Sequence, residues 1–228
     1  LLAAGVIVEI DGTGTLPLAD LLRRAERMFD LEAPVEEIAA RLGADSALAR
    51  TVGAEPGRRV PRNWDPFELA VRAVLGQQVS VAAARTHADR LLAILGVEGP
   101  GASFPAPDRI AAADLSGLSL PGARREALRG LAAAVADGRV DLSAEPREVR
   151  AALLALRGIG PWTADYVAMR GLEDRDAFPA GDLVLRQALA ADRRRLPSEA
   201  AVRARAEAWR PLRAYGALHL WASVGAGG

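Results

Sequence analysis

The chain has 228 residues, half of them hydrophobic, and its 29 basic residues balance its 29 acidic ones. That length suits one large domain or two small ones with cores of their own. Cysteine is absent, which excludes a disulfide framework, a cysteine zinc site and a four-cysteine iron–sulfur cluster. No apolar stretch has the length of a membrane span, and no basic segment precedes an apolar one at the N-terminus, so we expect a cytoplasmic protein without membrane contact.

The N-terminal part of the sequence predicts one short strand followed by helices. Residues 6–10 form the candidate strand, which ends in a glycine-containing turn at residues 11–14. A well-marked helix start follows at Asp65, Pro66 and Glu68, which supply the cap, the first-turn proline and the capping-box acid in that order. The helices predicted in this part cover residues 17–29, 35–42, 46–52 and 66–75.

The rest of the chain is predicted to be almost wholly helical. A Gly-Gln-Gln triplet at residues 76–78 interrupts the helix before it, and Ser80 can cap the next helix, which Gly96 ends. Another break falls near Pro211. The remaining helices are predicted over residues 81–95, 108–113, 122–136, 149–156, from residue 161 onward, 182–191 and 198–221.

Residues 156–161, Leu-Arg-Gly-Ile-Gly-Pro, form a tight turn between two predicted helices. Glycine tolerates the positive φ angles of such a turn, Ile159 would point inward as its apolar plug, and Pro161 suits the first position of the second helix. That helix presents unpaired backbone N–H groups at its positive dipole end, and these can hold a phosphate without reading a base. The same turn also serves as a plain connection between helices, so DNA binding and a structural role both stay open.

Asp182 opens the predicted helix that follows the hairpin some twenty residues later, at the position where an aspartate serves as N-cap. Together with the hairpin, this aspartate makes the sequence similar to the helix-hairpin-helix DNA glycosylase superfamily, and most of all to its DNA-3-methyladenine glycosylase II branch. The matching segments are residues 71–82, 156–171, 176–187 and 209–221, and the likeness extends over roughly residues 16–221.

The resemblance implies a mainly α fold in which two helical subdomains flank a DNA-binding cleft. The subdomain with the hairpin would cover residues 66–179, and the second would combine residues 15–65 with residues 180–226. This branch usually has an additional N-terminal β-rich domain, of which residues 1–14 would be a strand remnant. We therefore expect a fragment or an N-terminally shortened member of the branch.

The resemblance further implies a monofunctional DNA glycosylase of base excision repair. Such an enzyme flips a damaged nucleotide out of the duplex and hydrolyses the bond between base and sugar, here with alkylated purines of the 3-methyladenine and 7-methylguanine type. Asp182 would be the catalytic residue, since an ionised carboxylate stabilises the oxocarbenium character of the sugar and orients or deprotonates the attacking water. Two alternatives stay open: a glycosylase for deaminated or mismatched bases, and a non-catalytic DNA-binding protein that keeps the hairpin.

Four residues match positions of the family's base pocket, and a fifth matches its wedge. Trp162 and Tyr166 lie four positions apart on the second helix of the hairpin, so they share a face that can stack on a flipped base. Leu183 and Leu212 stand where the best-known members carry aromatic rings, which leaves the substrate range open. Gln78 takes the wedge position and would fill the gap left by the extruded base. The alternative roles are core packing for the rings and an ordinary polar turn for Gln78.

The hairpin backbone supplies the remaining predicted contacts. The phosphate-binding N–H groups would be those of Gly158, Gly160, Trp162 and Thr163. In relatives, hairpin carbonyls hold a monovalent cation that bridges to phosphate, and the matching carbonyls here are those of Leu154, Leu156 and Ile159. No other cofactor is expected.

All 29 basic residues are arginine, and the sequence contains no lysine. Lysine is the usual amine for Schiff-base chemistry at a sugar aldehyde, and bifunctional members of the superfamily use one in the second helix of the hairpin, where this chain has Trp162. A GC-rich genome that favours arginine codons would also explain the absence. In either case we expect no strand cleavage by this route.

The distribution of charge agrees with a DNA partner although the net charge is zero. Residues 153–228 hold 11 arginines against 8 acidic residues, whereas residues 1–65 hold 8 against 11. The excess positive charge therefore falls in the part that contains the hairpin. We expect a monomer with modest, salt-sensitive affinity for double-stranded DNA that contains damaged bases.

Overall fold

The computed structural model describes residues 7, 17–97, 99, 102–192 and 194–225. These residues form helices and no strand, so the prediction of a mainly α fold is confirmed. The strand predicted at residues 6–10 lies outside the described residues except for Ile7, which is exposed and has no regular secondary structure.

The helices of the described residues are, in chain order, α1 (Leu18–Met28), α2 (Val35–Gly43), α3 (Ala49–Ala54), α4 (Pro66–Leu75), α5 (Val81–Ile94), α6 (Pro107–Ala112), α7 (Gly122–Ala136), α8 (Pro146–Leu154), α9 (Pro161–Gly171), α10 (Leu183–Ala188), α11 (Glu199–Ala206), the 3-10 helix η1 (Glu207–Trp209) and α12 (Arg213–Ser223).

The helix starts follow from local side chains. The carboxylate of Asp65 accepts a hydrogen bond from the Phe67 N–H, and Ser80 accepts one from the Ala83 N–H, so both predicted caps are confirmed. The helix predicted from residue 46 begins later, at Ala49. The side chain of Asp45 accepts from the Ala47 N–H and makes a turn there instead of a helix.

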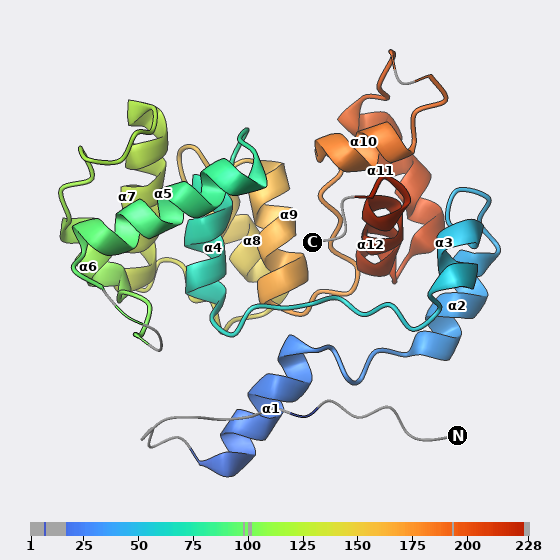
Figure 1. The fold of residues 1–228 in the computed structure, drawn as a ribbon, viewed down its shortest axis with the longest axis horizontal. Helices are drawn as coiled ribbons and strands as arrows, with labels where there is room; N and C mark the ends of the chain where they lie inside the picture. Colours follow the sequence, from blue (N-terminus) through green and yellow to red (C-terminus); the bar gives the residue numbers. More distant parts are fainter. Residues whose placement is uncertain (1–6, 8–16, 98, 100–101, 193, 226–228) are drawn as a thin grey trace.

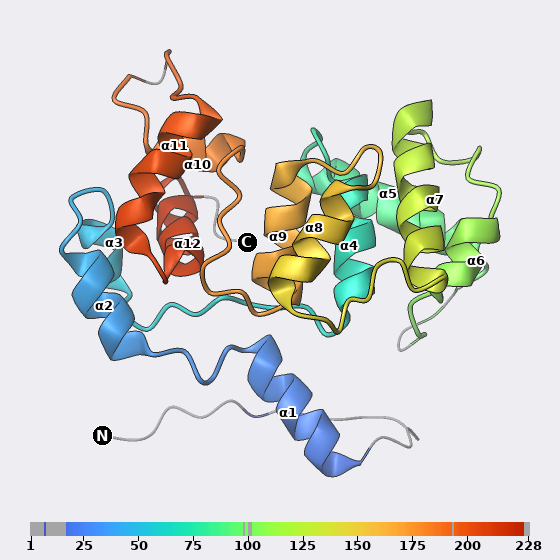
Figure 2. The same ribbon diagram turned by 180° about the vertical axis from the view of Figure 1, so that it is seen from behind.

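The helices after α1 form two groups, as Figures 1 and 2 show from opposite sides, and α1 is drawn below both. Helices α4 to α9 make the first group, in which α9 packs on α4 and α8, and α7 packs on α4 and α6. In the second group α12 packs on α3 and α10, and α2 packs on α3. The chain passes between the groups through residues 55–65 and again through residues 172–182. The proposed subdomain boundaries at residues 66 and 179 stay a prediction.

Helix α9 lies where the two hydrophobic cores meet. Its residue Val167 is buried in the core of the first group, whereas Ala168 and Met169 are buried in the core of the second. Tyr166 is half-buried and packs against both. Burial on both sides fixes α9, which also carries Trp162, relative to the helices that follow it.

A buried polar network ties α12 to the N-terminal part of the chain. The carboxylate of Asp30 is buried and accepts hydrogen bonds from the Tyr215 hydroxyl, at 2.9 Å, and from the Val60 N–H, at 3.1 Å. Arg62 pairs with the same carboxylate at 2.9 Å. Burial and the charge of Asp30 raise the pKa of Tyr215, so its hydroxyl keeps the proton that it donates. These contacts hold α12, the helix that carries Trp221.

Candidate active site

The hairpin turn between α8 and α9 depends on one glycine. Gly158 has a φ angle of 85°, which an L side chain rarely adopts. A Cβ atom at this position would also come within 2.6 Å of the Cβ atom of Ala127 on α7. The other glycine, Gly160, has a φ angle of −94° and does not need this freedom. The positive φ expected for the turn is therefore confined to Gly158.

The predicted phosphate-binding groups come together at the start of α9. Ile159 is buried in the first core, and Pro161 occupies the first turn of the helix, as predicted. The cap residue Gly160 offers no side-chain acceptor to the helix start. Within the described part of the chain, no acceptor is found for the backbone N–H groups of Gly158, Gly160, Trp162 and Thr163.

The three carbonyls predicted to hold a cation also lie in this turn. The Leu156 carbonyl accepts the Ile159 N–H at 3.1 Å and keeps one lone pair. Among the described residues, no backbone donor reaches the carbonyls of Leu154 and Ile159. Hard carbonyl oxygens of this kind suit a monovalent cation, and binding of one stays a prediction.

Asp182 is the N-cap of α10, which confirms the N-cap position predicted from the sequence. Its Oδ1 atom accepts the backbone N–H groups of Val184, at 2.9 Å, and Leu185, at 3.1 Å. These bonds satisfy two of the free donors at the helix start and fix the carboxylate beside the positive end of the helix dipole. The cap leaves the second oxygen, Oδ2, free to face other groups.

Two tryptophans complete the surroundings of this carboxylate. The indole N–H of Trp162 donates to Oδ2 at 2.9 Å, and that of Trp221 donates to Oδ1 at 3.0 Å. Asp182 therefore accepts four hydrogen bonds from neutral donors, and none of the ion pairs of the described residues includes it. Its negative charge is fixed in place without being neutralised.

Trp221 was not predicted as a site residue. It lies 39 positions after Asp182, on a different helix, and the sequence gives no local relation between the two. Trp221 is an aromatic residue at the end of the family-like segment 209–221, and this is the signal in the sequence that could have identified it.

The aromatic side chains stack beside the carboxylate. The rings of Trp162 and Tyr166 are 5.2 Å apart and nearly parallel, at 15°, so the predicted shared face is confirmed. Trp221 is tilted by 57° against Tyr166 at 6.4 Å. The guanidinium of Arg170 lies 5.7 Å from the Tyr166 ring centre. All three rings are half-buried, so parts of them stay accessible.

The two leucines predicted in the pocket have different surroundings. Leu183 follows Asp182 and is 55% exposed, so its side chain is open to a ligand. Leu212 is 3% exposed and packs inside the core of the second group. The structure therefore brings Leu183 to an accessible surface beside Asp182 and does not bring Leu212 there. The pocket role of both leucines stays a prediction.

The predicted wedge lies at the exposed turn between α4 and α5. Gln78 is exposed and has a φ angle of 55°, which is uncommon for a residue with a side chain. Val79 and Val81 beside it are also exposed, at 36% and 72%. The turn therefore presents an exposed polar side chain that is followed by two exposed apolar ones.

A second aspartate, Asp165, lies on α9 and has the opposite environment. It is 3% exposed and pairs with Arg150 of α8 and, at 3.4 Å, with Arg203 of α11. Arg203 also donates to Glu199 at 2.9 Å. Burial lowers the pKa of Arg203, but the hydrogen bond to Glu199 and the charge of Asp165 outweigh it, so the pKa is raised overall.

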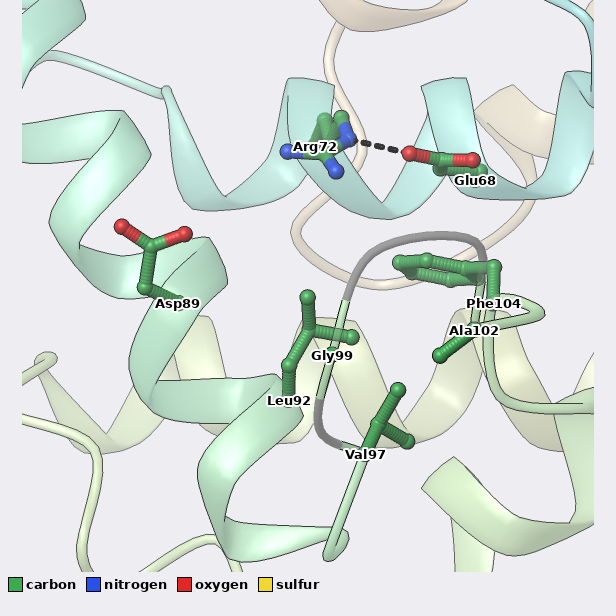
Figure 3. A pocket seen from close by; sticks show the side chains of 8 residues that line it. All are labelled: Glu68, Arg72, Asp89, Leu92, Val97, Gly99, Ala102 and Phe104. Atoms are coloured by element: carbon green, nitrogen blue, oxygen red, sulfur yellow. Dashed lines mark hydrogen bonds and ion pairs between the residues drawn. The ribbon is translucent and has the colours of Figure 1, made fainter.

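A pocket of about 320 Å³ opens at a different place, against α4 and α5 (Figure 3). There the guanidinium of Arg72 donates to Glu68 at 2.6 Å and lies 5.9 Å from the Phe104 ring centre. The lining residues are Glu68, Arg72, Asp89, Leu92, Val97, Gly99, Ala102 and Phe104. None of them is a predicted site residue. The carboxylate of Glu68 already pairs with Arg72, whereas that of Asp89 makes no ion pair among the described residues.

None of the described helices combines the length and hydrophobicity that a membrane span requires.

Comparison with known proteins relates most of the chain to curated relatives. The AlkA N-terminal domain model matches residues 3–65. The chain is 46% identical over 210 residues to the probable bifunctional transcriptional activator/DNA repair enzyme AlkA of Mycobacterium tuberculosis, over 88% of this chain and 42% of that protein. It is 37% identical over 219 residues to DNA-3-methyladenine glycosylase 2 of Escherichia coli, over 91% of this chain and 73% of that protein.

Solved structures show the same fold. The Schizosaccharomyces pombe 3-methyladenine DNA glycosylase, in complex with abasic DNA, has a TM-score of 0.72 at 25% identity and covers 83% of this chain and 97% of that one. MBOgg1 in complex with a DNA ligand has a TM-score of 0.76 at 20% identity, over 95% and 81% of the two chains, which supports the fold alone. The chain spans less than half of the Mycobacterium tuberculosis protein. The coverage of the Escherichia coli enzyme decides the assignment: the chain belongs to the DNA-3-methyladenine glycosylase 2 family of helix-hairpin-helix glycosylases.

Proposed function

We propose that this chain is a monofunctional DNA glycosylase that excises alkylated purines in base excision repair. The observation that carries the proposal is the carboxylate of Asp182, which is held by four neutral N–H donors next to a wall of stacked rings. The names of the relatives from Escherichia coli and Schizosaccharomyces pombe, both 3-methyladenine DNA glycosylases, support the same reaction.

The fixed carboxylate suits a reaction in which positive charge develops. As the bond between base and sugar breaks, the sugar gains oxocarbenium character, and an ionised Asp182 beside it stabilises that charge. Oδ1 already accepts three hydrogen bonds, whereas Oδ2 accepts one, from Trp162. Oδ2 is therefore the oxygen that can face the sugar or orient the attacking water. Because four donors hold the group, it needs no rearrangement at the moment of reaction.

The three aromatic rings beside Asp182 suit a cationic base. Trp162, Tyr166 and Trp221 offer electron-rich faces, and a 3-methyladenine or 7-methylguanine base carries a positive charge that such faces attract. The same charge makes the base a good leaving group. The enzyme then needs no strong general acid.

The hairpin and the turn at Gln78 are proposed to hold the DNA. The free N–H groups at the start of α9 would bind a phosphate of double-stranded DNA without reading sequence. Gln78, exposed on its turn, would enter the gap left by the flipped nucleotide. A monovalent cation at the carbonyls of Leu154, Leu156 and Ile159 would add a positive charge near that phosphate. We propose that the chain acts as a monomer.

The product is proposed to be an intact abasic strand. The chain has no lysine, so no side-chain amine is available to form an imine with the sugar aldehyde. The strand would then be cut only after alkali or heat. Borohydride reduction that traps a covalent adduct between DNA and an internal residue would contradict this part of the proposal.

A panel of lesion-containing duplexes tests the proposed function. Purified protein is incubated with duplexes that carry 3-methyladenine, 7-methylguanine, uracil or hypoxanthine, and the released bases are separated and counted. We expect release of the two methylated purines. Release of uracil or hypoxanthine alone would instead favour a glycosylase for deaminated bases, and DNA binding without any release would favour a non-catalytic protein.

A further inference from the structure

We propose that Gln77 is a positioning residue that locks the wedge turn to the phosphate-binding hairpin. This inference rests on the proposed function and deepens it, because it names the contact that joins two DNA-binding elements. The wedge turn is defined here as residues 76–80, between α4 and α5, and the hairpin as residues 155–163.

The side-chain amide of Gln77 bridges the two elements directly. Its Nε2 atom donates to the Gly158 carbonyl at 3.1 Å and to the Thr163 hydroxyl at 3.0 Å. The partners lie 81 and 86 positions further along the chain. Thr163 is 3% exposed, so the contact reaches into a buried part of the hairpin. One amide group therefore uses both of its hydrogens to hold one loop against the other.

The bridge leaves the phosphate-binding groups free. Gln77 uses the carbonyl oxygen of Gly158 and the hydroxyl of Thr163, whereas the backbone N–H groups of the same two residues have no acceptor among the described residues. A phosphate and the Gln77 amide can therefore bind the same residues at once. The position of the phosphate is in this way linked to the position of the wedge turn.

The backbone conformation of the wedge turn depends on contacts with neighbouring elements. Gln78, next to Gln77, has a positive φ angle that a side chain disfavours, and such conformations persist where the surroundings hold them. On one side of Gln78 the Ser80 hydroxyl caps α5, and on the other side the Gln77 amide is tied to the hairpin. The hairpin is itself closely packed on α7, because a Cβ atom at Gly158 would come within 2.6 Å of the Cβ atom of Ala127. Gln77 thereby ties the residue proposed to enter the duplex to a packed part of the molecule.

This geometry predicts an effect on base flipping and not on general DNA affinity. Without the bridge, the hairpin still presents its N–H groups, so phosphate binding and its salt dependence stay unchanged. The wedge turn would sample more positions, and fewer encounters would place Gln78 in the gap. The loss should therefore appear in the rate of the step that follows binding.

The test compares the same glutamine-to-methionine substitution at the bridge and at a control position. Gln77→Met keeps the length of the side chain and removes the donor, and Gln187→Met makes the same change on an exposed side chain of α10 that makes no hydrogen bond within the described residues. At saturating protein, we expect Gln77→Met to lower single-turnover release of 7-methylguanine about tenfold, the effect of losing the two hydrogen bonds of a half-buried amide. Affinity for undamaged duplex and its salt slope should stay within about twofold of wild type.

A double variant separates positioning from general structural damage. If Gln77 acts by way of Gln78, then Gln77→Met should cause no further loss in a Gln78→Ala background. Losses that multiply in the double variant, or a wild-type rate in Gln77→Met, would overturn the proposal. Should Gln77→Met fail to fold, Thr163→Val removes one of the two acceptors from the opposite side, and we expect it to lower the rate about threefold.

A readout without base release keeps the inference independent of the proposed chemistry. With 2-aminopurine at the target position, the rise in fluorescence on flipping should be smaller for Gln77→Met than for wild type and Gln187→Met. If wild type flips the probe but releases no methylated purine from the lesion-containing duplexes, the proposed reaction fails and this inference still stands. If Gln77→Met flips it as well as wild type does, the inference fails alone.

Discussion

Asp182 and Asp165 lie in adjoining parts of the molecule, and their carboxylates have opposite surroundings. Asp182 is half-buried at the start of α10 and accepts four hydrogen bonds from two backbone N–H groups and two indoles. Asp165 is buried on α9, three residues after Trp162, and pairs with the guanidinium groups of Arg150 and Arg203.

The two carboxylates differ in how far their neighbours compensate the negative charge. Neutral donors hold Asp182 without cancelling its negative charge, so that charge can act on a cation brought near it. Two arginines surround Asp165, so its charge is already compensated and serves to join α8, α9 and α11. The kind of donor around each carboxylate therefore supports the catalytic role proposed for Asp182 and a structural role for Asp165.

The largest expected effect is that of Asp182→Asn on catalysis. Asparagine is also a good N-cap, so α10 should keep its start and the protein its fold. The negative charge is lost, and we expect single-turnover base release to fall at least about a thousandfold, which corresponds to about 4 kcal/mol. Affinity for an abasic-site analogue should stay within about tenfold, because the hairpin holds the phosphate. Equal release by the variant and wild type would remove Asp182 from catalysis.

The same substitution at the other aspartate should act on stability instead. Asp165→Asn leaves Arg150 without a charged partner and Arg203 with Glu199 alone, and breaking a buried pair costs about 3–5 kcal/mol. Both arginine side chains are about one-third exposed, and water can solvate them, so we expect a smaller loss of about 2 kcal/mol in the free energy of unfolding. Denaturant titration measures that loss. Base release by the folded variant should stay within about threefold, and a loss as large as that of Asp182→Asn would contradict the comparison.

The sequence alone predicted the local parts of this arrangement. The bounds predicted for α4 and α7 agree with the structure, because caps, proline and glycine mark them within a few residues. The hairpin was predicted for the same reason, from its Gly-x-Gly turn and Pro161. The stacking of Trp162 on Tyr166 follows from their spacing of four residues on one helix.

The parts that depend on distant contacts could not be predicted. The bond between Trp221 and Asp182 joins helices 39 positions apart, and its existence depends on how α12 packs against α10. The bridge made by Gln77 spans more than 80 positions. Leu212 was assigned to the pocket because it stands where members of the family carry an aromatic ring, but packing in the second core leaves it 3% exposed. Tertiary packing decides these cases, and periodicity does not encode it.

The indole donors of Asp182 predict an intermediate effect. Trp162→Phe and Trp221→Phe each keep an aromatic ring and remove one hydrogen bond to the carboxylate. A hydrogen bond to a charged group contributes about 1.5 kcal/mol, so we expect each variant to release base about tenfold more slowly. Single-turnover rates on 7-methylguanine duplexes measure this effect.

Loss of a whole ring at the same place extends that test. Trp162→Ala removes the stacking surface as well as the hydrogen bond, and a stacked base contributes about 1–3 kcal/mol. Added to the loss of the hydrogen bond, stacking at the low end of this range should make the rate on alkylated purines fall about a hundredfold (about 2.8 kcal/mol). A wild-type rate in a folded Trp162→Ala protein would make Trp162 a core residue and place the pocket elsewhere.

The smallest expected effect comes from Gly181, which lies between the two carboxylate environments. A Cβ atom at Gly181 would lie 3.0 Å from Oε2 of Glu199, the residue that shares Arg203 with Asp165. The carboxylate of Glu199 is the far end of a flexible side chain and can move by a few tenths of an ångström. We therefore expect Gly181→Ala to change the free energy of unfolding by less than about 0.5 kcal/mol and base release by less than about threefold. A large loss of activity without loss of stability would show that the arginine network controls the position of Asp182, and the two carboxylates would then act as one unit.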